Sequence, residues 1–170
     1  MAKSSFINKI FNAGPLILLY YLCLSEVDTN LEKIFEIFTL NFQIILIYFW
    51  VLKRPDIMAN GHVFLAGLIN DVVMGFPLGI SSLSYLVVCF VGNYVRNKSV
   101  NTTIASDWFT FLIALLFANL LFFSLLNNFS EVAISYAKIG YNTFFTLFLF
   151  PVFWLLFNLY QISFIGSQDA

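Results

Sequence analysis

The residue most able to do chemistry is Asp71, a carboxylic acid inside a long apolar stretch of the sequence. A carboxylate near the centre of a membrane-spanning helix costs about 2.5–3.5 kcal/mol, and such residues often form proton or substrate sites. No Lys or Arg falls deep in a neighbouring apolar stretch. The partners available to Asp71 are therefore amides and hydroxyls, which favours the neutral, protonated carboxyl.

Small and polar residues surround Asp71 in a narrow stripe if the segment 60–77 is helical. Successive residues of a helix turn by about 100°, so the members of the stripe fall within an arc of about 140°. Small residues let another helix backbone approach closely, and polar residues in such a contact form hydrogen bonds between helices. The stripe consists of Gly67, Asn70, Asp71, Met74 and Gly75.

The sequence between Gly75 and Gly79 predicts a tight turn. Pro77 interrupts helical hydrogen bonding there, and glycine tolerates strained backbone angles. The next helix then returns antiparallel to the first, and pairing about residues 77–78 brings Ser84 or Tyr85 opposite Asp71. We expect Asp71 to form a hydrogen bond with one of these two hydroxyls.

Asp71 has two interpretations that the sequence leaves open. In the structural one, the stripe clamps two helices of this chain or docks a helix of a partner protein. In the functional one, Asp71 takes part in the transport of a proton or a solute. The chain has no evident pairing of a nucleophile with a base, and its one histidine (His62) and two cysteines (Cys23 and Cys89) make no obvious metal cluster. We therefore expect a non-enzymatic protein without a cofactor or a metal.

The composition predicts the elements that hold Asp71. The 170 residues are 61% hydrophobic and 10% charged, whereas soluble domains are about 45–50% apolar and about 25% charged. This balance predicts an all-α polytopic membrane protein with a single transmembrane domain over residues 1–170. An alternative for residues 34–77 is one full span followed by a re-entrant segment. Six spans are expected, at about 8–25, 34–52, 60–77, 79–95, 107–127 and 142–165.

The basic residues predict the orientation, because Lys and Arg in short loops favour the cytoplasm. With the N-terminus inside, six of the eight basic residues fall on the inner side, and both termini are cytoplasmic. The inner loop 53–60 begins with Lys53, Arg54 and Pro55. The net charge of −1 gives no basic footprint for nucleic acid.

An aromatic cluster before Pro55 is followed by the pattern Gly-Leu-x-x-Asp-x-x-x-Gly-x-Pro-Leu-Gly, which begins at Gly67, and then by an apolar helix. This stretch, between Tyr48 and Leu86, resembles the bacterial rod shape-determining MreD family. The remainder of the chain matches that family in length, hydropathy and a six-helix layout. Asn70 departs from the family pattern, because an apolar residue is usual beside the aspartate.

The resemblance implies a non-catalytic subunit of the cell-elongation machinery in the bacterial inner membrane. Members of the family work with MreC, a RodA-type glycosyltransferase, a class B penicillin-binding protein and MreB filaments, and they link cytoplasmic filaments to peptidoglycan synthesis. It also implies a fold similar to the substrate-binding subunits of energy-coupling-factor transporters. The motif positions carried over have structural roles in the family: Pro55, Gly67, Asp71, Gly75, Pro77 and Gly79.

Two further hypotheses remain beside this one. A substrate-binding subunit of a vitamin or small-molecule transporter predicts a mostly apolar pocket, in which Asp71, Asn119 and Asn158 supply polar groups. A proton-coupled channel or carrier depends on Asp71 alone. For the elongation subunit, the outer segments 26–36 and 128–141 are the largest surfaces available to a periplasmic partner, and the basic inner loops face filaments or anionic lipid.

Overall fold

The chain folds into helices throughout the part that the structure describes. The computed structural model describes residues 2–25, 34–98, 103–129 and 136–165, with side chains for 11–25, 42–98, 103–129 and 140–163. These ranges contain no strand, which confirms the predicted all-helical class. The helices are α1 (Ala2–Leu24), α2 (Ile34–Lys53), α3 (Asn60–Met74), α4 (Ile80–Lys98), α5 (Ile104–Phe129) and α6 (Tyr136–Tyr160), followed by the π-helical turn η2 (Gln161–Ile165).

The helices coincide with the six predicted apolar segments, but α3 is shorter than expected. It ends at Met74, whereas the sequence predicted a helix to residue 77. Gly75 has φ 67°, in the left-handed region, and this conformation ends the helix. Asp71 therefore lies in the last turn of α3 and not in the middle of a longer helix.

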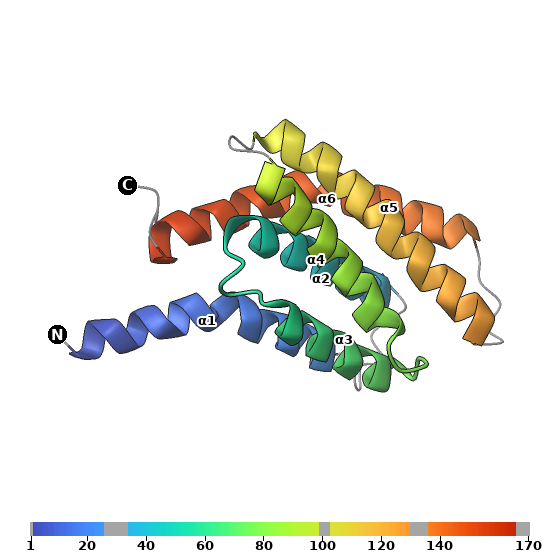
Figure 1. Cartoon of the computed structure of the whole chain (residues 1–170), viewed down its shortest axis with the longest axis horizontal. Helices are drawn as coiled ribbons and strands as arrows, with labels where there is room; N and C mark the ends of the chain where they lie inside the picture. Colours follow the sequence, from blue (N-terminus) through green and yellow to red (C-terminus); the bar gives the residue numbers. More distant parts are fainter. Residues whose placement is uncertain (1, 26–33, 99–102, 130–135, 166–170) are drawn as a thin grey trace.

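Consecutive helices alternate in direction along the bundle (Figure 1). α4 packs against α2, α3 and α5, and α2 also packs against α1 and α6. α2 is accordingly the most enclosed helix among those described: every side chain from Gln43 to Leu52 is buried. A helix that is covered on all sides in this way forms the centre of a fold.

The starts of α1, α3 and α5 and the ends of α2, α4 and α6 lie toward one end of the bundle (Figure 1). We call this the basic end, because Lys53, Arg54, Arg96 and Lys98 belong to it. The opposite end contains the turn between α3 and α4, and we call it the hairpin end. Most of the outer segments 26–36 and 128–141, predicted as partner surfaces, lies outside the described residues.

Two helical stretches in the described part are long and apolar enough to cross a membrane, namely Ile104–Phe129 and Gly140–Ser163. Phe11–Leu24 and Phe42–Lys53 are shorter apolar stretches. Large apolar side chains also cover the outward faces of α5 and α6. Exposed examples are Phe109, Phe117, Leu120, Phe144, Phe148 and Leu155.

Candidate functional site

The turn between α3 and α4 is built around two glycines with positive φ. After α3 ends, the Gly75 N–H donates to the Val72 carbonyl (3.4 Å) and the Phe76 N–H donates to the Asp71 carbonyl (2.9 Å). This pair of bonds is the Schellman arrangement that closes a helix at a left-handed glycine. Gly79, with φ 102°, lets the chain enter α4 in a conformation that other residues rarely adopt.

This turn brings the Asp71 carboxylate to the N-terminus of α4. Asp71 Oδ2 accepts the Gly79 N–H at 2.7 Å, and Oδ1 accepts the Ser81 N–H at 2.9 Å. The first N–H groups of a helix have no partner within the helix, and they carry the positive end of its dipole. Asp71, which is fully buried, thus caps a helix that it does not belong to. Both oxygens of the side chain act as acceptors in this arrangement.

The predicted partners of Asp71 were the hydroxyls of Ser84 and Tyr85, and both are engaged elsewhere. The Ser84 hydroxyl donates to the Ile80 carbonyl at 2.9 Å within α4, and the Tyr85 hydroxyl donates to Gln43 Oε1 on α2. The prediction of a hydroxyl partner was wrong because α3 ends at Met74. The early stop brings Asp71 level with the first amides of α4.

A buried chain of hydrogen bonds extends from Tyr85 across three helices. Gln43, which accepts the Tyr85 hydroxyl, donates through Nε2 to Asn70 Oδ1 at 3.3 Å. Asn70 Nδ2 in turn donates to the Ser81 hydroxyl at 3.0 Å. Buried polar groups that all have hydrogen-bond partners fix how the helices pack. A group that lost its partner would have no water nearby to replace it, which is costly.

Gly67 lies at the closest approach between α3 and α4. A Cβ atom on Gly67 would lie 2.6 Å from the Ser82 backbone nitrogen, which is much shorter than a normal contact. The Ser82 hydroxyl donates to the Phe64 carbonyl at 3.1 Å, one turn before Gly67. The stripe that contains Gly67, Asn70 and Asp71 is therefore covered by α4 of the same chain.

Ser81 and Ser82 are functional members of this site that the sequence analysis did not single out. Their position could have indicated them: they lie two and three residues after Gly79, in the first turn of a helix that follows a turn, where the backbone amides have no partner within the helix. Pro77 is half-buried in the turn, whereas Gly75 is exposed and has open space around its Cα. Gly75, although part of the stripe, therefore ends α3 through its left-handed conformation and does not pack against another helix.

A second buried carboxylate, Asp107, lies near the basic end. Its Oδ2 accepts the Trp154 indole N–H from α6 at 3.0 Å, and it pairs with Lys53 Nζ at the end of α2 at 3.4 Å. The Lys53 ammonium also lies 5.6 Å from the centre of the Trp154 ring. Asp107 Oδ1 is buried with no hydrogen-bond partner in the described part of the chain. The cluster joins α2, α5 and α6.

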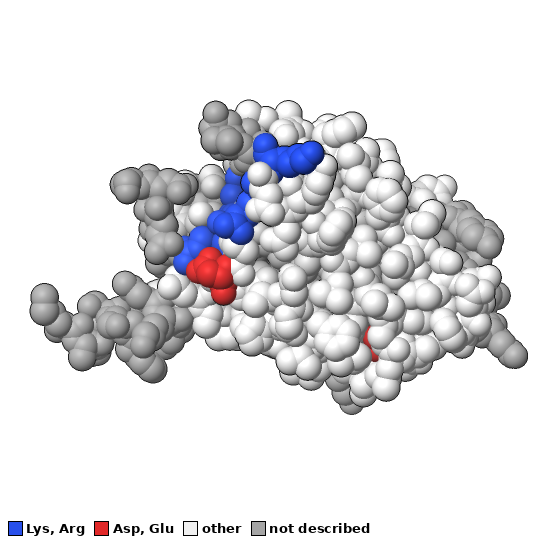
Figure 2. Space-filling view, in the orientation of Figure 1, with Lys and Arg blue, Asp and Glu red and all other residues white. Residues whose placement is uncertain are grey.

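The loop after α2 contains a second ion pair. Arg54 donates to both carboxylate oxygens of Asp56, at 3.0 and 2.8 Å. These hydrogen bonds from Arg54 lower the pKa of Asp56 below its usual value. Figure 2 shows that Lys and Arg side chains form one stripe on this face, next to an acidic group. The predicted loop residues Lys53 and Arg54 both face groups of their own chain, and Pro55, which follows them, is half-buried.

The contacts of these residues hold α3 against α4 and join α2, α5 and α6. Among the residues that the structure describes, no three His, Cys, Asp or Glu side chains come together as metal ligands. Comparison of the chain with models of protein families, with curated proteins and with solved structures gave no match.

Proposed function

We propose that the chain is a bacterial inner-membrane protein with six spans and cytoplasmic termini. Support comes from six helices of alternating direction, two of them long and apolar enough to cross a bilayer, and from the apolar outward faces of α5 and α6. The gathering of Lys53, Arg54, Arg96 and Lys98 at one end fits the enrichment of basic residues in cytoplasmic loops.

Cysteine labelling tests this topology at the two ends of α4. Leu78 is 70% exposed in the turn before α4, and Lys98 is exposed at its other end. With Cys23 and Cys89 replaced, we expect Leu78→Cys to react with a membrane-impermeant maleimide in intact spheroplasts. Lys98→Cys should react only after lysis. Labelling of both positions from the same side would contradict a full span by α4.

We further propose that the protein is a non-catalytic subunit of the cell-elongation machinery that holds its partners by helix packing. The observation that carries this proposal is the use of the motif residues in the structure. Gly67, Asp71 and Gly79 join α3 to α4 and leave no reactive group exposed at the motif. A protein built in this way acts through its surfaces.

Two surfaces in the described part of the chain are available to partners in this proposal. The outward faces of α5 and α6 present aromatic side chains to the bilayer, where the helices of an MreC-like protein, a RodA-type glycosyltransferase or a class B penicillin-binding protein pack. The basic end faces the cytoplasm, where MreB filaments and anionic lipids lie. The stripe on α3 is not one of these surfaces, because α4 covers it.

Site-specific photo-crosslinking in native membranes tests the proposal. A benzoylphenylalanine in place of Phe117 or Phe148, both strongly exposed, should crosslink to an MreC-like protein or a cell-wall synthase. The same replacement at Phe111, which is fully buried on α5, is the control and should give no partner. Outward positions that capture only lipid would contradict an adaptor role.

The transporter hypothesis gives a different result in the same experiment. The captured partners would then be a pair of ATPases and a coupling membrane protein. Against this hypothesis, Asn119 donates to Thr143 at 2.9 Å, and Asp71 is occupied by the α4 amides. Neither of these residues nor Asn158 lines the cavity between α1, α2 and α6.

A further inference from the structure

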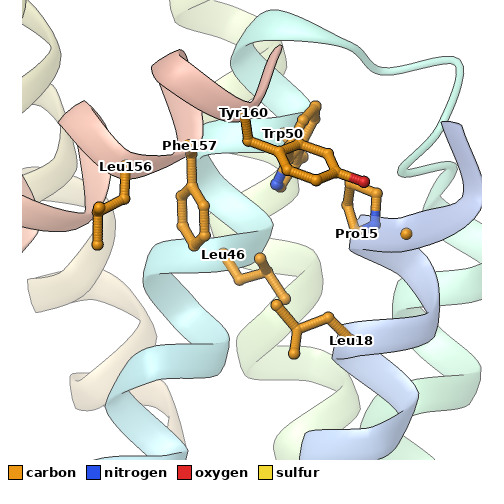
Figure 3. A pocket seen from close by; sticks show the side chains of 8 residues that line it. Pro15, Leu18, Leu46, Trp50, Leu156, Phe157 and Tyr160 are labelled. Atoms are coloured by element: carbon orange, nitrogen blue, oxygen red, sulfur yellow. The ribbon is translucent and has the colours of Figure 1, made fainter. Parts of the chain in front are cut away.

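A cavity of about 300 Å³ lies between α1, α2 and α6. Its walls are apolar except for the polar atoms of one tryptophan and one tyrosine, and Figure 3 shows the side chains around it. A volume of this size is at the lower end of the range for ligand pockets. The lining residues are Gly14, Pro15, Leu18, Leu46, Trp50, Leu156, Phe157 and Tyr160.

Trp50 supplies a hydrogen-bond donor without a partner at this cavity. The residue is 1% exposed, and its indole N–H is buried with no acceptor in the described part of the chain. In Figure 3 the indole nitrogen points into the space among the labelled side chains. The other two tryptophans each donate, Trp108 to the Leu147 carbonyl and Trp154 to Asp107. A buried donor without an acceptor is rare in proteins and calls for a ligand or another explanation.

The position of Trp50 along α2 indicates which acceptor would meet it. Trp50 lies one helical turn before Arg54, and the Arg54 N–H donates to the Trp50 carbonyl at 2.7 Å. If the basic end lies at the cytoplasmic headgroups, as the proposed function has it, Trp50 lies just below them. Tryptophan is enriched at this depth of a bilayer. The acceptors at that depth are the ester carbonyls of phospholipids.

We infer that this cavity binds one acyl chain of an anionic phospholipid, and that the ester carbonyl of the chain accepts the Trp50 indole N–H. The inference rests on the proposed membrane placement. The apolar walls from Leu18, Leu46 and Leu156 enclose the methylene groups. The basic stripe at the same end attracts the negative headgroup.

Tyr160 lines the cavity beside the Trp50 donor. Its ring stands edge-to-face on the Trp50 ring, with 6.1 Å between centroids, and lies in front of the indole in Figure 3. The Tyr160 hydroxyl donates to the Phe11 carbonyl of α1 at 3.0 Å. This bond needs Gly14, because a Cβ there would lie 2.5 Å from the hydroxyl oxygen.

Photolabelling with a diazirine-bearing phosphatidylglycerol in proteoliposomes tests the site. Leu155 and Leu156 are adjacent on α6 and equally exposed, at 52%, but only Leu156 lines the cavity. We expect crosslinks at Leu18 and Leu46 in the wild type, reduced about tenfold by Leu156→Trp, which fills the cavity. Leu155→Trp, the matched control, should leave them unchanged.

The hydrogen bond is tested in the wild-type protein, without a variant that risks the fold. Unlabelled phosphatidylglycerol with ester linkages should compete about fivefold better than its diether analogue, a ratio that corresponds to one hydrogen bond. Equal competition by the two lipids would show that no ester carbonyl accepts the Trp50 N–H.

Crosslinks confined to outward residues such as Ile17 would show surrounding lipid only and would overturn the site. That result would leave the membrane placement intact, whereas extraction of the chain from membranes by carbonate would contradict the placement and the lipid site together. Failure to capture elongation partners, with the cavity still labelled, would contradict the proposed function alone.

Discussion

The two buried aspartates, Asp71 and Asp107, show two ways to hold a carboxylate away from water. Asp71 is bound by backbone amides that lie 8 and 10 residues further along the chain. Asp107 is bound by the side chains of Lys53 and Trp154, which come from two other helices. The first arrangement satisfies both oxygens, and the second leaves Oδ1 without a partner among the described residues.

The difference predicts which aspartate contributes more to stability. The amides that bind Asp71 are fixed by the Gly75–Gly79 turn, so little additional entropy is lost when the bonds form. Lys53 is a long flexible side chain, 19% exposed, and ordering it offsets part of the attraction to Asp107. We therefore expect the hairpin end to be more sensitive to substitution than the junction of α2, α5 and α6.

Asp71→Ala should produce the largest loss of folding stability. It leaves the N–H groups of Gly79 and Ser81 without an acceptor, at about 1–3 kcal/mol each, so we expect about 2–6 kcal/mol of destabilisation. Asp71→Asn keeps one acceptor oxygen and should cost roughly half as much. Helical circular dichroism in mixed micelles of increasing SDS content measures both. If both variants unfold at the same SDS content as the wild type, Asp71 does not stabilise the start of α4.

Gly67→Ala should produce the next largest loss of stability, because the new methyl group would clash with the Ser82 backbone. Forcing α3 and α4 apart should cost about 1–3 kcal/mol. Gly61→Ala is the matched control on the same helix, since a Cβ there meets nothing within 4 Å. That variant should be neutral or gain up to about 1 kcal/mol from helix propensity. Similar SDS midpoints for the two variants would mean that α3 and α4 are not closely packed.

Lys53→Met should cost about 1–2 kcal/mol, since it leaves Asp107 without its cation in a site that is only partly closed to solvent. In Lys53→Met with Asp107→Asn, the neutral amide no longer needs that cation, so the double variant should recover part of the loss. The same SDS titrations of the two single variants and the double variant measure this coupling. Strict additivity would show that the two charges do not interact.

A third carboxylate, Asp56, extends the comparison to the surface, where the smallest effect is expected. Hydrogen bonds from Arg54 lower the pKa of Asp56 in the folded protein, so the pair stabilises the fold above the unfolded pKa of Asp56, near 3.8. This contribution disappears as the pH falls through the lowered folded value. Because the Asp56 side chain is 59% exposed, solvent screening limits the effect to at most about 0.5 kcal/mol.

Stability curves of the wild type and Asp56→Asn against pH check this expectation. The two should differ by a small constant amount above about pH 5 and converge as Asp56 becomes protonated. Curves that diverge on acidification would reverse the sign and exclude the ion pair as the cause.

The sequence predicts the Asp71 region well, because its determinants are local. A carboxylate, two glycines and Pro77 within a few residues indicate a buried polar contact beside a turn. The exact partners were missed, since the conformation of Gly75 decides where α3 ends. Moving the end of the helix by three residues, from 77 to 74, exchanges hydroxyl partners for backbone amides.

The Asp107 region is beyond this kind of prediction. Asp107 stands at the start of a predicted span and Lys53 at the end of another, where charges usually face water. Their pairing depends on how α2, α5 and α6 pack. Trp154 is 47 residues from Asp107 in the sequence, and no local pattern connects them. The cavity beside Trp50 depends on long-range packing for the same reason.

The origin of the Asp107 partners has a consequence for how the protein is made. The α3–α4 contacts involve neighbouring segments and can form as soon as both helices have left the ribosome. The bond from Trp154 to Asp107 requires α6, the last long helix that the structure describes. A chain that ends before α6 would lack the Trp154 donor, and of the two side chains that bind the Asp107 carboxylate only Lys53 would remain.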